Sequence, residues 1–262
     1  MKQHSSATRY VLPTMAVLLY AFLYIPIFVL ITFSFNNGAN TSQWTGFSLR
    51  WYYELFYSLD ILNALKNSLI VAACSTGLSL VMGVMFVFYS SRSILKRLLL
   101  AFYVNLAVPE IVLAVGLLSF LTFMSVPLGM TSLIAGHTLI GLGYVIPLVH
   151  SRFEELDNRY TEASLDLGAT PTQTLLRVIV PLLYPALISG GLLAFIVSLD
   201  DFVISFFVAG GSTQTLPMYI FSLIRSGATP VVNAISTLLL LTSSIAVLLY
   251  SLISVRTQGE SR

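Results

Sequence analysis

Charged residues and cysteine are both scarce in this sequence. Only 9% of the 262 residues are charged, whereas 56% are hydrophobic and the mean hydropathy is +0.88. Because Cys74 is the one cysteine, a disulfide within the chain and a cysteine-based metal cluster are excluded. The three histidines lack the spacing of metal ligands, so we expect no metal site. A composition this apolar is typical of a membrane protein with several spans.

The sequence also lacks a phosphate-binding loop. It has no Gly-x-x-x-x-Gly-Lys-Ser/Thr pattern, and none of its three lysines follows a glycine. Such a chain cannot cradle the phosphates of ATP, so an ATP-driven process would need hydrolysis on a separate subunit. We therefore expect a non-catalytic protein without a cofactor of its own.

Long apolar segments without charges make up most of the chain. A helix needs about 20 residues to cross a hydrocarbon layer of roughly 30 Å. These segments are apolar on all faces, which excludes the two-residue alternation of a membrane β-barrel. We predict one all-α integral-membrane domain over residues 1–262. Its six spanning helices are expected near residues 11–34, 67–90, 98–123, 131–150, 182–208 and 231–254.

The basic residues predict the orientation of these spans. With both termini in the cytoplasm, ten lysines and arginines fall on cytoplasmic segments and three fall outside: Arg50, Lys66 and Arg225. An excess of basic residues marks the cytoplasmic side. The first span is predicted to be an uncleaved anchor, because its apolar run is too long for a signal peptide. The net charge of +2 then reflects topology and gives no support to nucleic-acid binding.

Three carboxylates lie inside the predicted spans: Glu110, Asp200 and Asp201. A carboxylate at mid-bilayer costs at least about 2.5 kcal/mol, so such residues usually line a cavity. The spans contain no lysine or arginine at comparable depth to pair with them. We predict that Glu110 and Asp200 line a solute pathway. Asp201 is the weaker candidate, because neighbours on one continuous helix point about 100° apart.

The first predicted outer loop, residues 35–66, is rich in aromatic residues. The ordinary interpretation is a belt of rings at the membrane surface. The alternative is that Trp51 or a neighbouring tyrosine offers its ring face to a cationic solute at the outer mouth. We keep Trp51 as a candidate pathway residue.

The polar segment 151–181 separates the fourth and fifth predicted spans and is the longest cytoplasmic loop. It contains Glu162-Ala163-Ser164-Leu165-Asp166-Leu167-Gly168 and continues to Val178-Ile179-Val180-Pro181. These residues resemble the EAA loop of permease subunits in binding-protein-dependent ABC importers, which reads E-A-A, three residues, G, nine residues, I, one residue, L-P. The positions in register are Glu162, Ala163, Gly168 and Pro181. The resemblance implies that this loop contacts an ATPase through Glu162, Ala163, Asp166 and Gly168.

Local signals predict how this loop folds. Gly168 can end a helix, because glycine adopts the left-handed conformation at C′ without steric strain. A second helix is expected to begin directly afterwards, with Thr170 as N-cap and Pro171 at its first position.

Further segments along nearly the whole chain resemble the second permease subunit of spermidine/putrescine importers. They are Tyr24-Ile25-Pro26, Ser34-Phe35-Asn36, Trp51-Tyr52, Pro109-Glu110-Ile111-Val112 and Ser198-Leu199-Asp200-Asp201-Phe202-Val203. The family often has aspartate where this chain has Glu110. The resemblance implies a type I importer fold in the bacterial inner membrane and polyamine uptake. The implied partners are a second permease, two copies of an ATPase that binds ATP and Mg²⁺, and a periplasmic binding protein.

Other interpretations remain open at this point. A related importer could carry iron or an amino acid. A secondary transporter is disfavoured, because such folds typically show inverted repeats and this sequence shows none clearly. An intramembrane aspartyl protease would need two carboxyls that face each other and share a proton. Adjacent residues on one helix diverge, so Asp200 and Asp201 do not predict that chemistry.

Overall fold

The computed structural model describes residues 6–39, 43–90, 99, 102–103, 107–156, 159–211, 213–227, 230–242 and 244–245. The regular elements within these ranges are helices, and one isolated antiparallel bridge pairs Asn36 with Phe47. The chain divides into two compact units, Asp60–Tyr219 and Met1–Leu59 with Ile220–Arg262. The all-helical architecture expected from the sequence is confirmed.

Four helices in the described part of the chain are long and apolar enough to cross a membrane: Pro13–Ser34, Leu59–Ser90, Met130–Glu155 and Pro171–Asp200. Two shorter apolar helices, Glu110–Phe123 and Pro230–Thr242, fall within the other two predicted spans. Several membrane spans are therefore present, and the count of six stays a prediction. The end of the last predicted span, beyond residue 245, lies outside the described residues.

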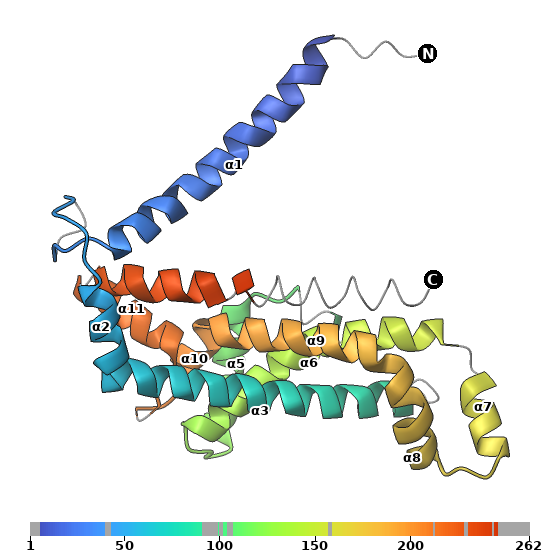
Figure 1. Cartoon of the computed structure of the whole chain (residues 1–262). Helices are drawn as coiled ribbons and strands as arrows, with labels where there is room; N and C mark the ends of the chain where they lie inside the picture. Colours follow the sequence, from blue (N-terminus) through green and yellow to red (C-terminus); the bar gives the residue numbers. More distant parts are fainter. Residues whose placement is uncertain are drawn as a thin grey trace. The chain divides into compact units, whose positions relative to one another are not determined.

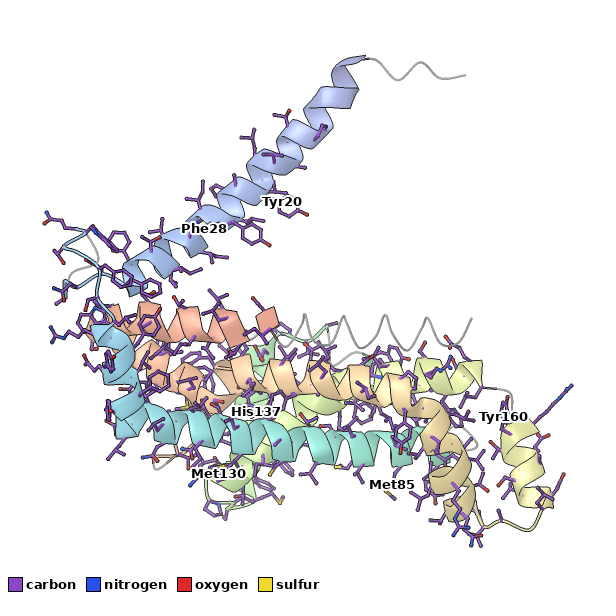
Figure 2. All side chains as sticks on the ribbon, viewed as in Figure 1. Tyr20, Phe28, Met85, Met130, His137 and Tyr160 are labelled. Atoms are coloured by element: carbon purple, nitrogen blue, oxygen red, sulfur yellow. The ribbon has the colours of Figure 1, made fainter. Side chains whose placement is uncertain are left out.

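The unit that contains the chain's N-terminal part holds α1 (Ser6–Ser34) and α2 (Arg50–Tyr57). Large apolar side chains such as Phe22 and Phe28 are exposed along α1. Figure 2 shows Tyr20 and Phe28 projecting from this helix. A helix that is apolar all round is suited to lipid or to a neighbouring membrane helix rather than to water.

The unit formed by Asp60–Tyr219 is a bundle of apolar helices. Its main elements are α3 (Leu59–Ser90), α5 (Glu110–Phe123), α6 (Met130–Glu155), α9 (Val180–Asp200) and α10 (Val203–Val208). Helix α6 packs extensively against α9, and α10 packs against α5 and α6 (Figure 1). Small residues allow this close approach, because a Cβ atom on Gly136 would lie 2.7 Å from Cγ2 of Ile204.

Two clusters of buried side chains form the core of this unit. Val87, Val145 and Leu183 belong to the cluster shared by α3, α6 and α9. Leu133 and Ile204 belong to the second cluster, in which α10 packs against α5 and α6. The second cluster fixes α10 close to the start of α5, which is where the intramembrane carboxyl groups meet.

The predicted continuous span 182–208 is wrong, because the helix is interrupted within it. Helix α9 ends at Asp200, Asp201 has an extended backbone (φ −66°, ψ 122°), and α10 begins at Val203. The physical reason is that the Asp201 side chain accepts hydrogen bonds from backbone N–H groups ahead of it. Aspartate competes with the helical ladder in this way, and the chain then starts a new helix.

Residues 98–123, predicted as one span, are interrupted at Pro109, a residue that can break the backbone ladder. Residues 107–109 are not helical, and α5 begins at Glu110 after Pro109, which has φ −55° and ψ 130°. Proline has no N–H group to continue a preceding helix but is accepted at the start of a new one. Glu110 therefore opens a helix instead of lying within one. Residues 98, 100–101 and 104–106 of this prediction lie outside the described residues.

Two other boundaries differ from the prediction. Helix α3 begins at Leu59, so Lys66 lies in the helix instead of in the outer loop. Helix α6 continues to Glu155, past the predicted end at residue 150. The predicted loop 151–181 accordingly holds the end of α6 together with α7 (Arg159–Asp166), α8 (Pro171–Thr174) and the π-helix Leu175–Ile179. Figure 1 shows α7 and α8 at one end of the bundle, beyond α9.

Candidate functional site

The helix end predicted at Gly168 is confirmed. Gly168 has φ +85°, its N–H donates to the carbonyl of Leu165 at 2.9 Å, and Ala169 N–H donates to Ser164 at 3.1 Å. This pair of bonds is a Schellman motif, which closes α7 and turns the chain sharply. No heavy atom lies within 4 Å of a Cβ placed on Gly168. Glycine is therefore required here by the backbone conformation and not by lack of space.

The helix restart predicted at Thr170 is also confirmed. Thr170 Oγ1 accepts from the N–H of Gln173 at 3.3 Å, and Thr170 N–H donates to Gln173 Oε1 at 2.9 Å. This reciprocal pair is a capping box, and Pro171 occupies the first turn. A hydrogen bond of 3.0 Å between Ser164 Oγ and Thr174 Oγ1 joins α7 to α8. The two short helices thus form one folded unit at the end of the bundle.

A groove with a volume of about 570 Å³ lies between α7 and the segment formed by α8 and the π-helix Leu175–Ile179. It is lined by Arg159, Tyr160, Ala163, Ser164, Leu167, Ala169, Gln173, Arg177 and Val178. Tyr160 and Leu167 are 52% and 89% exposed, and Figure 2 shows Tyr160 on α7. Exposed apolar side chains that gather on a polar segment are typical of a protein-binding surface.

The four residues that the resemblance marks for coupling have different positions on this helical unit. Ala163 lines the groove, Glu162 and Asp166 are exposed outside it, and Gly168 forms the turn. Sequence reasoning missed Tyr160 and Leu167. The signal that could have found them is the presence of two large apolar residues in an otherwise polar loop helix.

Asp201 is buried at the interruption between α9 and α10. Its Oδ1 accepts from the N–H of Ile204 at 3.2 Å, and its Oδ2 accepts from the N–H of Ser205 at 2.9 Å. The side chain has no exposed surface. Asp201 thus caps α10, and its first role in this chain is structural.

The three carboxyl groups gather where the two helix interruptions meet. The Glu110 carboxyl lies beside Asp201, close enough for their side chains to interact, and Asp200 is near enough to influence it electrostatically. Glu110 and Asp200 are exposed, in contrast to Asp201. Within the described residues, no ion pair joins any of the three to a lysine or arginine. Negative charge in this cluster is therefore not balanced by a lysine or arginine of the described part.

His137 lies in the interior of the bundle (Figure 2). It comes from α6 and is 2% exposed. Its Nδ1 is 2.7 Å from Ser198 Oγ, its Nε2 is 3.0 Å from Ser205 Oγ, and Nε2 is 3.4 Å from Asp201 Oδ2. Both ring nitrogens of His137 therefore have polar partners inside the bundle. That His137 connects the two sides of the helix interruption was not visible in the sequence.

The structure places Trp51 away from any open surface. The side chain is 6% exposed, its Nε1 donates to the carbonyl of Asn36 at 2.7 Å, and Arg50 Cζ lies 5.0 Å from the ring centroid. One ring face is thus already occupied by a cation of the chain itself. This placement favours a structural role in the outer loop and gives no support to the predicted contact with a solute.

The fold is that of a membrane permease of ABC transport systems. The chain is similar, with a TM-score of 0.75 and 18% identity, to a bacterial ABC transporter involved in the import of the acidic polysaccharide alginate. The similarity covers 96% of this chain and 99% of that one. A bacterial alginate ABC transporter in complex with an alginate pentasaccharide-bound periplasmic protein gives a TM-score of 0.66 at 17% identity. It covers 93% of this chain and 91% of that one, and at such identities both likenesses show the fold alone.

Residues 75–258 match the family of binding-protein-dependent transport system inner membrane components, and the chain belongs to this family. A curated relative is the spermidine/putrescine transport system permease protein PotC of Haemophilus influenzae, 39% identical over 90% of this chain and 93% of the relative. Another is the putrescine transport system permease protein PotI of Escherichia coli, 35% identical over 84% of this chain and 82% of the relative. The chain is therefore a multi-pass transport component, as the EAA-like residues predicted.

Proposed function

We propose that this chain is the permease subunit of an ATP-driven importer that takes up spermidine or putrescine across the bacterial inner membrane. The observation that carries the proposal is the gathering of Glu110, Asp200 and Asp201 at two helix interruptions, with no lysine or arginine paired to them among the described residues. The names of the relatives at 39% and 35% identity point to the same class of substrate.

The charge of this cluster selects for a cation. Moving an ammonium group into a low-dielectric layer is costly, and carboxylates that replace part of its water shell offset that cost. An anion approaching the same cluster would instead be repelled. The fold does not make this distinction, because the alginate transporter with the same fold imports an acidic polysaccharide.

The two exposed acids are proposed to contact the solute directly. Glu110 and Asp200 have free access from the surface of the chain, whereas Asp201 has both oxygens bonded to backbone N–H groups. Asp201 contributes negative charge to the pathway from its buried position. An extended polyamine carries several ammonium groups, and the neighbouring acids offer more than one of them a partner.

The proposal also includes the orientation of the chain and the partner subunits that transport would require. Six spans with both termini inside place segment 151–181 in the cytoplasm, where the exposed apolar groove on α7 would meet an ATPase. Two copies of that ATPase would bind ATP and Mg²⁺, since this sequence has no phosphate-binding loop. A second permease subunit would complete the pathway, and a periplasmic binding protein would deliver the polyamine.

Uptake measurements in cells test the substrate class. A strain that lacks this gene is compared with the same strain carrying it on a plasmid, using labelled putrescine, spermidine, iron and an amino acid mixture. We expect uptake of one or both polyamines to depend on the gene, with uptake of the other solutes unchanged. Gene-dependent uptake of iron or of an amino acid alone would overturn the polyamine assignment and favour a related importer.

A further inference from the structure

The interruption between α9 and α10 needs side chains to hold it. A continuous helix keeps its direction through the backbone hydrogen-bond ladder. Here the ladder stops at Asp200 and resumes at Val203, so the direction of α10 relative to α9 is not fixed by the backbone alone. An interruption of this kind acts as a hinge unless other contacts bridge it.

One side chain from a third helix bridges this interruption. The imidazole of His137 reaches Ser198 of α9 through Nδ1 at 2.7 Å and Ser205 of α10 through Nε2 at 3.0 Å. The same Nε2 lies 3.4 Å from Oδ2 of Asp201, the residue that caps α10. Because the imidazole ring is rigid, these contacts fix the spacing of the two helix ends.

The bridge belongs to a buried polar network. Ser75 of α3 contacts Ser198 at 3.3 Å, and Ser75, Ser198, Ser205 and His137 are all at least nine-tenths buried. Polar groups inside a bundle are costly when unpaired, so the network favours the one arrangement in which all its members are bonded. In this arrangement the Glu110 carboxyl lies beside Asp201 and within electrostatic reach of Asp200.

We infer that His137 is a positioning residue for transport, which holds the α9–α10 interruption so that Glu110 and Asp200 face the solute in a fixed geometry. This inference rests on the proposed function. His137 itself is buried and does not contact the solute. Its loss is expected to change the affinity for the polyamine more than the amount of folded protein.

Three substitutions of His137 test its contact with α9 and its contacts with α10 separately. His137→Asn places an amide near the position of Nδ1 and can keep the contact with Ser198. His137→Gln places an amide near the position of Nε2 and can keep the contacts with Ser205 and Asp201. His137→Leu removes both. The matched control is Ser79→Ala, which deletes a buried hydrogen bond of 3.1 Å from α3 to Thr138 of α6 without touching the interruption.

Polyamine uptake by the complete importer gives the functional measurement. For His137→Leu we expect the KM to rise about tenfold or more, the size expected when a hydrogen bond near a charged group is lost. The Asn and Gln variants should fall between the Leu variant and the wild type, and Ser79→Ala should keep the wild-type KM. A wild-type KM for His137→Leu at a normal membrane level would overturn the inference. So would absence of all three His137 variants from the membrane while Ser79→Ala is present, since His137 would then be a folding residue.

A measurement of the distance between α9 and α10 tests the inference without depending on the identity of the substrate. Spin labels are attached at Ile188→Cys on α9 and Phe206→Cys on α10, both exposed positions, in the full chain with Cys74→Ala. We expect a narrow distance distribution that broadens with His137→Leu and stays narrow with Ser79→Ala. An unchanged distribution overturns the inference even if polyamine uptake falls. A wild-type importer that carries no polyamine would instead refute the proposed function and leave the distance result to decide the role of His137.

Discussion

At the scale of single residues, the three carboxyl groups of the cluster differ in their surroundings and therefore in their expected roles. Asp200 and Glu110 are exposed on the surface of the chain, whereas Asp201 is buried with both oxygens bonded to backbone N–H groups. Substitution by the corresponding amide keeps the shape of each side chain and removes its charge. The comparison of the three amides thus separates contact with a solute from support of the helix interruption.

Asp200→Asn and Glu110→Gln are expected to reduce polyamine uptake about tenfold or more each, because an ion pair at about 4 Å is worth between about 1 and 4 kcal/mol. Both residues are exposed, so their protein levels in the membrane should stay near wild type. Uptake of labelled spermidine and putrescine, normalised to the amount of protein on an immunoblot, measures the effect. Wild-type uptake by both variants would mean that these acids are structural.

Asp201→Asn is expected to lower the stability of the folded chain. One of the two oxygens that accept from Ile204 and Ser205 becomes an amide nitrogen, which cannot accept a hydrogen bond. Loss of a helix cap of this kind costs about 0.5–2 kcal/mol. Thermal unfolding of the protein in detergent should show a lower midpoint than for Asp200→Asn, which serves as the exposed control. Equal midpoints for the two variants would contradict the capping role.

At the scale of elements, the helical unit formed by α7 and α8 has its shape because of two local motifs. The Schellman turn at Gly168 ends α7, and the capping box of Thr170 and Gln173 starts α8. Together these motifs set the angle at which α7 presents its exposed apolar side chains, Tyr160 and Leu167. A change in the turn should therefore affect the surface offered to an ATPase without affecting the membrane helices.

Gly168→Val is expected to disrupt this turn, because a residue with a β-carbon in the left-handed conformation costs about 1–2 kcal/mol. Transport and solute-stimulated ATP hydrolysis by the assembled importer should fall strongly while the chain remains in the membrane. Gly168→Asn is the matched control, since asparagine tolerates the left-handed conformation better than other residues, and it should retain much of the activity. Normal transport by Gly168→Val would exclude a coupling role for the turn.

At the scale of the whole molecule, the chain has the features of one part of a larger assembly. Apolar side chains are exposed along α1, and further ones are exposed on α7 and in the turn that follows it. Membership in the family of inner membrane components gives the chain a role in transport. Because the sequence has no phosphate-binding loop, the proposed function assigns ATP hydrolysis to another subunit.

The purified chain alone is expected neither to bind nor to hydrolyse ATP. Hydrolysis should appear when the ATPase subunit is added and should rise further with binding protein loaded with polyamine. Phosphate release from the reconstituted components, added one at a time, measures this division of labour. ATP hydrolysis that remains with the isolated chain through its last purification step would refute the proposal that another subunit hydrolyses ATP.

The sequence by itself determined the features that depend on local composition. A long apolar segment must satisfy its backbone polar groups internally, so the membrane helices could be predicted from their residues. The turn at Gly168 and the helix start at Thr170 could also be predicted, because each motif is completed within a few residues. The EAA-like residues predicted the family, because they lie within one short segment of the sequence and can be recognised without the fold.

Only the tertiary structure decided how the candidate pathway is built. Residues 182–208 were predicted as one continuous helix, whereas the structure interrupts that helix at Asp201 and brings Asp201 beside Glu110. Whether Asp201 caps a new helix depends on the packing of α10 against α5 and α6. His137 joins this arrangement from a position 61 residues before Ser198 in the chain. Contacts over such a separation are selected by packing and burial in the folded bundle, which no local pattern in the sequence encodes.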